Sequence, residues 1–234
     1  MAGTVGAGGE GLTNVVLDFR PSRHGLHFRN AFEPGRALRI IQPGATVMGL
    51  CGGMAFVVRD LFERGIDPPA DRDPPKRGSR HYQALYRREV ESFDWFRLPI
   101  RFWVWSALHP EQPTWWSRLL RRRPIGELTL EDEWPRIRAQ IDAGELAMVG
   151  LVRGRGFDPR KLTLNHQVLA YGYRVDPGLI VLRVYDPNHP DRDDVEARID
   201  LSGPVPTVSS WPDEPLCGFF SAKYHPGEPR AWHG

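Results

Sequence analysis

The sequence predicts an α+β fold in which a helix packs against an antiparallel sheet. Apolar residues after Cys51 recur with the period of a helix. The segments 165–173 and 179–185 are instead rich in β-branched and aromatic residues, which is typical of strands. The turn-forming residues 176–178 join these two segments, and so short a link makes neighbouring strands antiparallel.

The N-terminal region is predicted to contribute little regular structure. Residues 1–11 are rich in glycine and lack a basic and apolar signal pattern, so we expect a disordered tail. Residues 12–19 and 37–42 are predicted as short strands or extended segments. A loop containing proline and arginine follows the first of them, at 20–23.

The helix after Cys51 has the clearest periodicity in the chain. Gly65 is its natural C-terminal stop, and the segment 67–80, dense in proline and charge, is predicted as a loop. The expected buried face has the spacing i, i+3, i+4, i+7, i+8 and consists of Met54, Val57, Val58, Leu61 and Phe62.

Two further helices and a strand are predicted before the hairpin. Residues 81–96 show helical spacing of apolar side chains. A second helix is predicted from Thr129, as its N-cap, to Gly144. The apolar run 146–152 is predicted as a buried strand.

The segment 93–116 is unusually rich in tryptophan, and arginines follow it. One interpretation is an aromatic wall or lid beside a cleft, to which Trp103 and Trp105 would contribute. The alternative is core packing with a solvated basic edge. Aromatic and basic residues together also fit single-stranded nucleic acid, but a net charge of only +2 argues against that partner.

Cys51 is the strongest candidate for a reactive group. It lies where a helix begins, near backbone N–H groups and the positive end of the helix dipole, which both favour the nucleophilic thiolate. Gly52 and Gly53 lack Cβ atoms and would let the backbone approach a substrate. The alternative is that Cys51 is a small buried hydrophobic residue.

His166 and Asp186 are predicted to be neighbours across the hairpin. A turn at Pro177 places His166 opposite the stretch from Asp186 to about Asn188. Partners across strands have Cβ atoms about 5 Å apart, so the imidazole gains a carboxylate or carboxamide that can orient it. Asn188 is the alternative to Asp186, because residues two apart share a strand face. A competing interpretation is a purely structural histidine at 166 and a simple turn at 186–188.

With a cysteine at a helix start, a histidine opening a strand and an aspartate ending the next strand, the chain resembles the papain-like cysteine peptidase superfamily. The motifs at 166–173 and 185–187 are more similar to the bacterial branch that cleaves double-glycine leader peptides, in which the third residue is Asp. The resemblance covers residues 42–190, although papain's Cys-Gly-Ser-Cys-Trp and Asn-Ser-Trp-Gly motifs are missing. It implies one catalytic domain over 12–234, or two lobes, with an aromatic-rich insertion near 93–124.

The resemblance also implies roles for individual residues. Cys51 would attack a carbonyl carbon, His166 would hold and return the proton, and Asp186 would fix the imidazole. The oxyanion would be bound by the N–H of Cys51 and by a side-chain donor upstream, for which Gln42 and Asn30 are candidates. The candidate substrate-binding residues are Gly52, Gly53, Asn165, Trp103 and Trp105.

Three function classes fit these residues. The first is a peptidase or amidase that uses a Cys-His-Asp triad and a thioacyl intermediate, with a peptide or amide substrate. The second is an acyltransferase, similar to transglutaminases or arylamine acetyltransferases, which passes the acyl group to an amine. The third is a binding domain of the same fold without catalysis.

The cysteine content and the spacing of possible ligand residues argue against a disulfide-rich or metal-binding protein. Two cysteines make no disulfide framework, and Cys217 is predicted as a core strand residue. The histidines and acids have no metal-ligand spacing, and the acidic run 191–194 lacks the glycine and closing glutamate of a calcium loop. We expect no metal and no cofactor.

Without a secretory signal or an apolar run of about 18 residues, a cytoplasmic protein is expected, and signal-independent export stays open.

Overall fold

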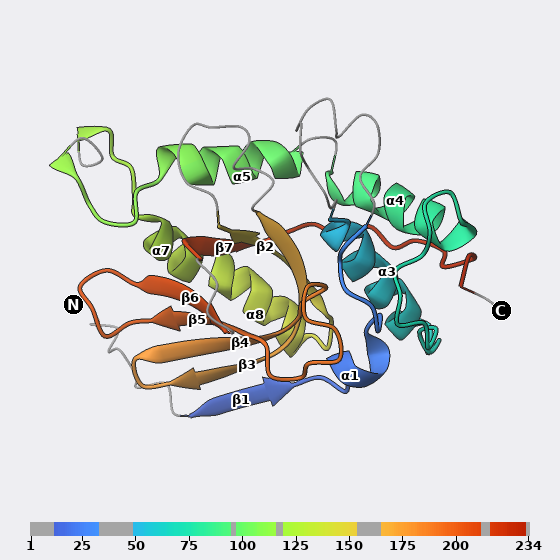
Figure 1. The fold of residues 1–234 in the computed structure, drawn as a ribbon. Helices are drawn as coiled ribbons and strands as arrows, with labels where there is room; N and C mark the ends of the chain where they lie inside the picture. Colours follow the sequence, from blue (N-terminus) through green and yellow to red (C-terminus); the bar gives the residue numbers. More distant parts are fainter. Residues whose placement is uncertain are drawn as a thin grey trace.

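The structure is a computed structural model, and it describes residues 12–32, 49–94, 97–115, 119–153, 165–211 and 216–232. They form the mixed helical and antiparallel fold that the sequence predicts (Figure 1). A seven-stranded sheet has the order β6-β5-β4-β3-β2-β7, with β1 paired to β3. Over these ranges, no helix has the length and apolar character needed to cross a membrane.

The element boundaries are as follows. The strands are β1 (Thr13–Val16), β2 (Ala147–Val152), β3 (His166–Asp176), β4 (Leu179–Tyr185), β5 (Glu196–Asp200), β6 (Thr207–Trp211) and β7 (Gly218–Ser221). The helices are α1 (Pro21–His24), α3 (Cys51–Glu63), α4 (Arg80–Ser92), α5 (Arg97–Leu108), α7 (Ile125–Leu128), the π-helical η1 (Thr129–Glu133) and α8 (Trp134–Asp142).

Strand β3 is the longest strand described and pairs with three neighbours. Its first half pairs with β2 and its second half with β1, while β4 runs along its other side. The β3–β4 hairpin is therefore confirmed, and Gly178 in its turn has a φ of +82°, which glycine adopts without strain. The register pairs Leu169 with Tyr185, so His166 is directed toward the residues that follow Tyr185.

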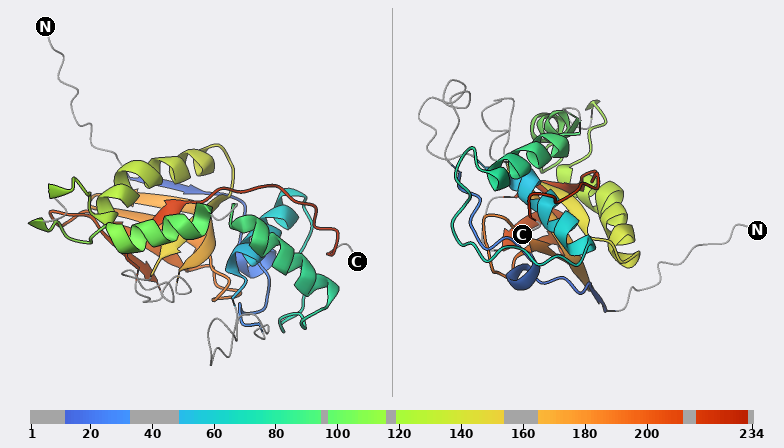
Figure 2. Two further views of the ribbon diagram at one scale, coloured as in Figure 1. Left: turned by 90° about the horizontal axis from the view of Figure 1, so that it is seen from above. Right: turned by 90° about the vertical axis from the view of Figure 1, so that its right-hand side faces the viewer.

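The two faces of the sheet are covered by different helices (Figure 2). Met148 and Val152 of β2 belong to the apolar cluster that includes α3 and α5. Ala147, Val149 and Leu151 belong instead to the cluster that includes α8. This alternation follows from the two-residue period of a strand. Because both faces of β2 are covered, the sequence of this strand is an unbroken apolar run.

Helix α4 ends earlier than the sequence predicts. It begins after Ser79, whose hydroxyl oxygen accepts a hydrogen bond from the N–H of Tyr82 at 3.2 Å. It ends at Ser92, short of the predicted end at residue 96, because the chain turns at Asp94, where φ is +43°. Residues 95 and 96 lie outside the described ranges.

Two other boundary predictions are wrong. Helical structure begins at Ile125, so Thr129 is not an N-cap, and its hydroxyl oxygen accepts a hydrogen bond from the N–H of Phe219 at 3.2 Å. Cys217 precedes β7 instead of lying within it, and its side chain is half-buried. The predicted strand at 37–42 and the tail at 1–11 lie outside the described residues.

Helices α3 and α4 meet at a point where only glycine fits. A Cβ on Gly53 would lie 2.2 Å from the backbone oxygen of Leu85 and 2.9 Å from the backbone nitrogen of Glu89. A Cβ on Gly52 would lie 2.2 Å from the hydroxyl oxygen of Ser92. Because two of these contacts are with backbone atoms, α3 reaches its observed distance from α4 only with a glycine at 53.

We predict that Gly53→Ala lowers the free energy of unfolding by about 1 to 3 kcal/mol, since overpacking against backbone forces the two helices apart. Gly203→Ala is the matched control, because its new Cβ would meet only the Val205 oxygen at 3.5 Å. We expect the control to change stability by less than about 0.5 kcal/mol. Equal stability of the two variants in chemical denaturation would contradict this packing.

Candidate active site

Cys51 is the first residue of α3, and its side chain is half-buried. The residue before it, Leu50, occupies the N-cap position and has no capping side chain. The N–H of Leu50 donates instead to the side-chain oxygen of Asn30 at 2.6 Å. The thiol therefore lies at the N-terminal end of the helix, as the sequence predicts.

His166 and Asp186 form a buried pair at the open end of the β3–β4 hairpin. The Nε2 atom of His166 lies 2.5 Å from Oδ1 of Asp186, and the two residues are only 4% and 2% exposed. Cys51 is the other group close enough to act on the imidazole, since it raises the pKa of His166 as Asp186 does. The imidazole thus has a buried carboxylate as its hydrogen-bond partner and a thiol in its electrostatic surroundings.

The electrostatics of the pair favour its charged form. Burial alone would lower the pKa of His166, but Asp186 and Cys51 outweigh it and raise the pKa to about 10. Burial would raise the pKa of Asp186, but His166 outweighs it and lowers the pKa to about 2. The Asp186 carboxylate also accepts the N–H of Asn188 at 2.7 Å and lies 3.6 Å from the Arg153 guanidinium.

Glu89 is a buried acid beside this site that no sequence motif indicated. From α4, its Oε2 atom accepts the N–H of Gly53 at 2.7 Å, and the nearby N–H of Gly52 also favours its ionised form. Burial raises the pKa of Glu89 to about 7, although these N–H groups and His166 oppose the shift. The burial of Glu89 could nevertheless have been predicted from spacing. Leu85, Glu89 and Ser92 follow the i, i+4, i+7 spacing of a buried helical face.

The bonds to Glu89 correct two expectations about the first turn of α3. Gly52 and Gly53 are buried and face α4 and β3, so their Cα atoms lack the open surface expected of substrate-binding residues. The N–H of Gly53 is bound by Glu89, and the N–H of Gly52 acts on the same carboxyl group. Among the described residues, no acceptor binds the N–H of Cys51 itself.

Asn30 and Asn188 connect two segments beside the site through hydrogen bonds. The side-chain nitrogen of Asn30 donates to the side-chain oxygen of Asn188 at 3.1 Å. The backbone N–H of Asn30 donates to the oxygen of Pro187 at 2.9 Å. Asn188 is therefore not the group that orients His166, and Asp186 is. Gln42 lies outside the described residues.

Trp105 does not contribute to the predicted aromatic wall, and Trp103 is not shown to line a cleft. Trp105 is 7% exposed, and its ring packs 5.2 Å from that of Phe220 in the core, so it does not line a cleft. Trp103, two residues away on α5, is 36% exposed, since residues two apart on a helix point in nearly opposite directions. Asn165 precedes β3, and its side-chain oxygen accepts the N–H of Arg153 at 3.0 Å.

A metal site is not indicated among the described residues. The residues that the structure describes contain no group of three or more His, Cys, Asp or Glu side chains placed to hold a metal ion. Cys51 and Cys217 are both free thiols. No protein-family model, curated protein or solved structure matches the chain, so its chemistry has to be inferred from this geometry.

Glu89 gives the site a pH dependence that can be measured. As pH rises through about 7, the Glu89 carboxyl group ionises and places a negative charge beside Cys51 and His166. We predict an inflection near that pH in the rate at which iodoacetamide alkylates Cys51, and no such inflection in Glu89→Gln. Glu127→Gln, which removes an acid from α7, should keep it. An unchanged profile in Glu89→Gln would show that Glu89 does not act on the thiol.

Proposed function

We propose that the protein is a cysteine-dependent hydrolase that cleaves a peptide or amide bond. The observation that supports this most directly is the buried hydrogen bond between His166 and Asp186, together with the effect of Cys51 on the same imidazole, whose pKa it raises. A nucleophile, a base and a group that orients the base are the three parts that covalent catalysis by a thiol requires. A structural histidine would not need a thiol at a helix start as its second partner.

The first half of the reaction forms a thioacyl intermediate. The Cys51 thiolate attacks the acyl carbon, a C–S bond forms, and the C–N bond breaks. His166, which the site holds as an imidazolium, gives its proton to the departing nitrogen. Asp186 stays ionised throughout and keeps the ring in place.

The second half releases the acid. A water molecule gives a proton to the now neutral His166 and attacks the thioacyl carbon, and the C–S bond breaks to leave the thiolate and the imidazolium. The N–H of Cys51 is the proposed first donor to the oxyanion, because Glu89 binds the N–H of Gly53 and lies near that of Gly52. Asn30 is the proposed second donor, since a carboxamide has two N–H bonds and Asn188 accepts one of them.

The fold supports a papain-like architecture as part of the proposal. The nucleophile helix α3 packs against β3, which begins with the histidine, and the aspartate directly follows the antiparallel strand β4. An aspartate in the third position favours the bacterial branch that cleaves double-glycine leader peptides over papain itself. A peptide is therefore the proposed substrate.

We predict that iodoacetamide alkylates Cys51 rapidly at about pH 6, where an ordinary thiol with a pKa of about 8.5 is almost wholly protonated. His166→Ala should slow this reaction, because the thiolate loses its counter-charge. Cys217 is an internal control in the same protein. Equal labelling of the two cysteines at this pH would contradict the proposal.

Turnover of a peptide library tests the catalytic step itself. Cys51→Ala should lower hydrolysis by at least about three orders of magnitude, whereas Cys217→Ala should leave it nearly unchanged. Product analysis with and without an added amine separates hydrolysis from acyl transfer. Hydrolysis that survives in Cys51→Ala would rule out Cys51 as the nucleophile.

A further inference from the structure

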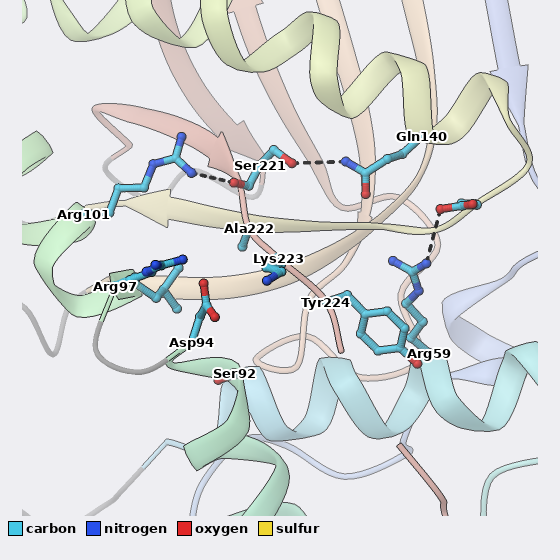
Figure 3. Close-up of a pocket in the computed structure, with 12 residues that line it drawn as sticks. Arg59, Ser92, Asp94, Arg97, Arg101, Gln140, Ser221, Ala222, Lys223 and Tyr224 are labelled. Carbon is cyan, nitrogen blue, oxygen red and sulfur yellow. Dashed lines mark hydrogen bonds and ion pairs between the residues drawn. The ribbon is translucent and has the colours of Figure 1, made fainter. Parts of the chain in front are cut away.

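A cavity of about 570 Å³ lies along α3, and Cys51, His166 and Asp186 do not line it. Its walls come from α3, the corner between α4 and α5, α5, α8, the turn before β2 and the segment that follows β7 (Figure 3). The volume falls within the range of small-molecule sites. The cavity is therefore large enough for an organic ligand rather than a single ion.

Two cationic side chains at the cavity, Arg97 and Lys223, have no ion-pair partner among the described residues. Arg97 and Lys223 are exposed, and within the described part of the chain neither makes an ion pair or a side-chain hydrogen bond. In Figure 3 they reach toward the same part of the cavity from α5 and from the segment after β7. A guanidinium and an ammonium group together supply donors suited to a phosphate or carboxylate.

A third cation is fixed in the wall. Arg59 is 6% exposed, and its Nε atom is held 2.6 Å from Glu63. Its Nη2 atom lies 3.6 Å from Glu145, which is longer than a hydrogen bond. Arg101 is by contrast fully engaged, since it binds Glu133 at 2.6 Å and the backbone oxygen of Ser221 at 2.8 Å.

Asp94 limits the charge of the ligand. Its carboxylate lies between Arg97 and Lys223 in Figure 3, and it is 3.3 Å from Nε2 of His225. The backbone of Asp94 is in the left-handed region, with φ at +43°, and such outliers often mark functional sites. A carboxylate in the wall disfavours a polyanion, so a ligand with one oxyanion group fits best.

Apolar surface completes the cavity. Leu98 and Ala222 are buried residues of its wall, and the ring of Tyr224 stacks 3.9 Å from the Arg59 guanidinium carbon. These groups offer contacts to the body of an organic molecule. We propose that the cavity binds a small organic anion, with its phosphate or carboxylate group at Arg97 and Lys223 and its body against Leu98, Ala222 and Tyr224.

The test uses two probes that share a ring and differ in the oxyanion, phenyl phosphate and benzoate, with benzyl alcohol as the neutral control. Titration of the full chain, followed by calorimetry or NMR, should show saturable binding of at least one anion and weaker binding of the alcohol. Arg97→Gln with Lys223→Gln should weaken that binding at least about tenfold. Which anion binds distinguishes a phosphate ligand from a carboxylate ligand.

The matched control is Lys76→Gln with Arg77→Gln, which removes the same two charges from the exposed loop before α4. It should bind the probe as the unmodified protein does. Cys51→Ala should also bind it normally, so the result does not depend on the proposed hydrolase activity. The proposal is overturned if neither anion saturates, if the alcohol binds as tightly, or if both double variants lose affinity equally.

Discussion

The buried pair of His166 and Asp186 is the interaction on which the site depends. Both side chains are almost fully enclosed, and removing two charges from water is costly unless they are paired and hydrogen-bonded. The surrounding structure meets this condition, because Asn188 donates an N–H to the carboxylate and Arg153 adds a nearby positive charge. The β3–β4 hairpin sets the distance between the two residues, and β2 fixes the start of β3 from its other side.

The first turn of α3 has two structural roles that involve the same backbone N–H groups. It presents the thiol to His166, and it packs against α4 closely enough to require glycine at 53. Burying that contact leaves helix N–H groups without water, and Glu89 accepts a hydrogen bond from the N–H of Gly53. The end of α3 that favours a thiolate at Cys51 therefore also favours the carboxylate of Glu89. Glu89 ionises near neutral pH.

The parts of the fold that local patterns determine were predictable from the sequence. The period of apolar residues predicts α3, and the turn at Pro177 predicts the hairpin and so the meeting of His166 with Asp186. The roles of Gly53 and Glu89 depend on contact between two helices, which no local pattern specifies. Likewise, the abundance of tryptophan does not reveal which side of α5 faces the core, and Trp105 proved to be buried there.

The protonation state of His166 tests the central claim most directly. We expect NMR of the imidazole nitrogens to show both protonated at about pH 8, well above the usual histidine pKa of about 6.5. Proton loss should occur near the raised pKa of about 10. In Asp186→Asn and Cys51→Ala, each lacking one of the charges that hold the imidazolium, the proton should be lost at lower pH. A neutral His166 ring at about pH 7 in the unmodified protein would contradict the account.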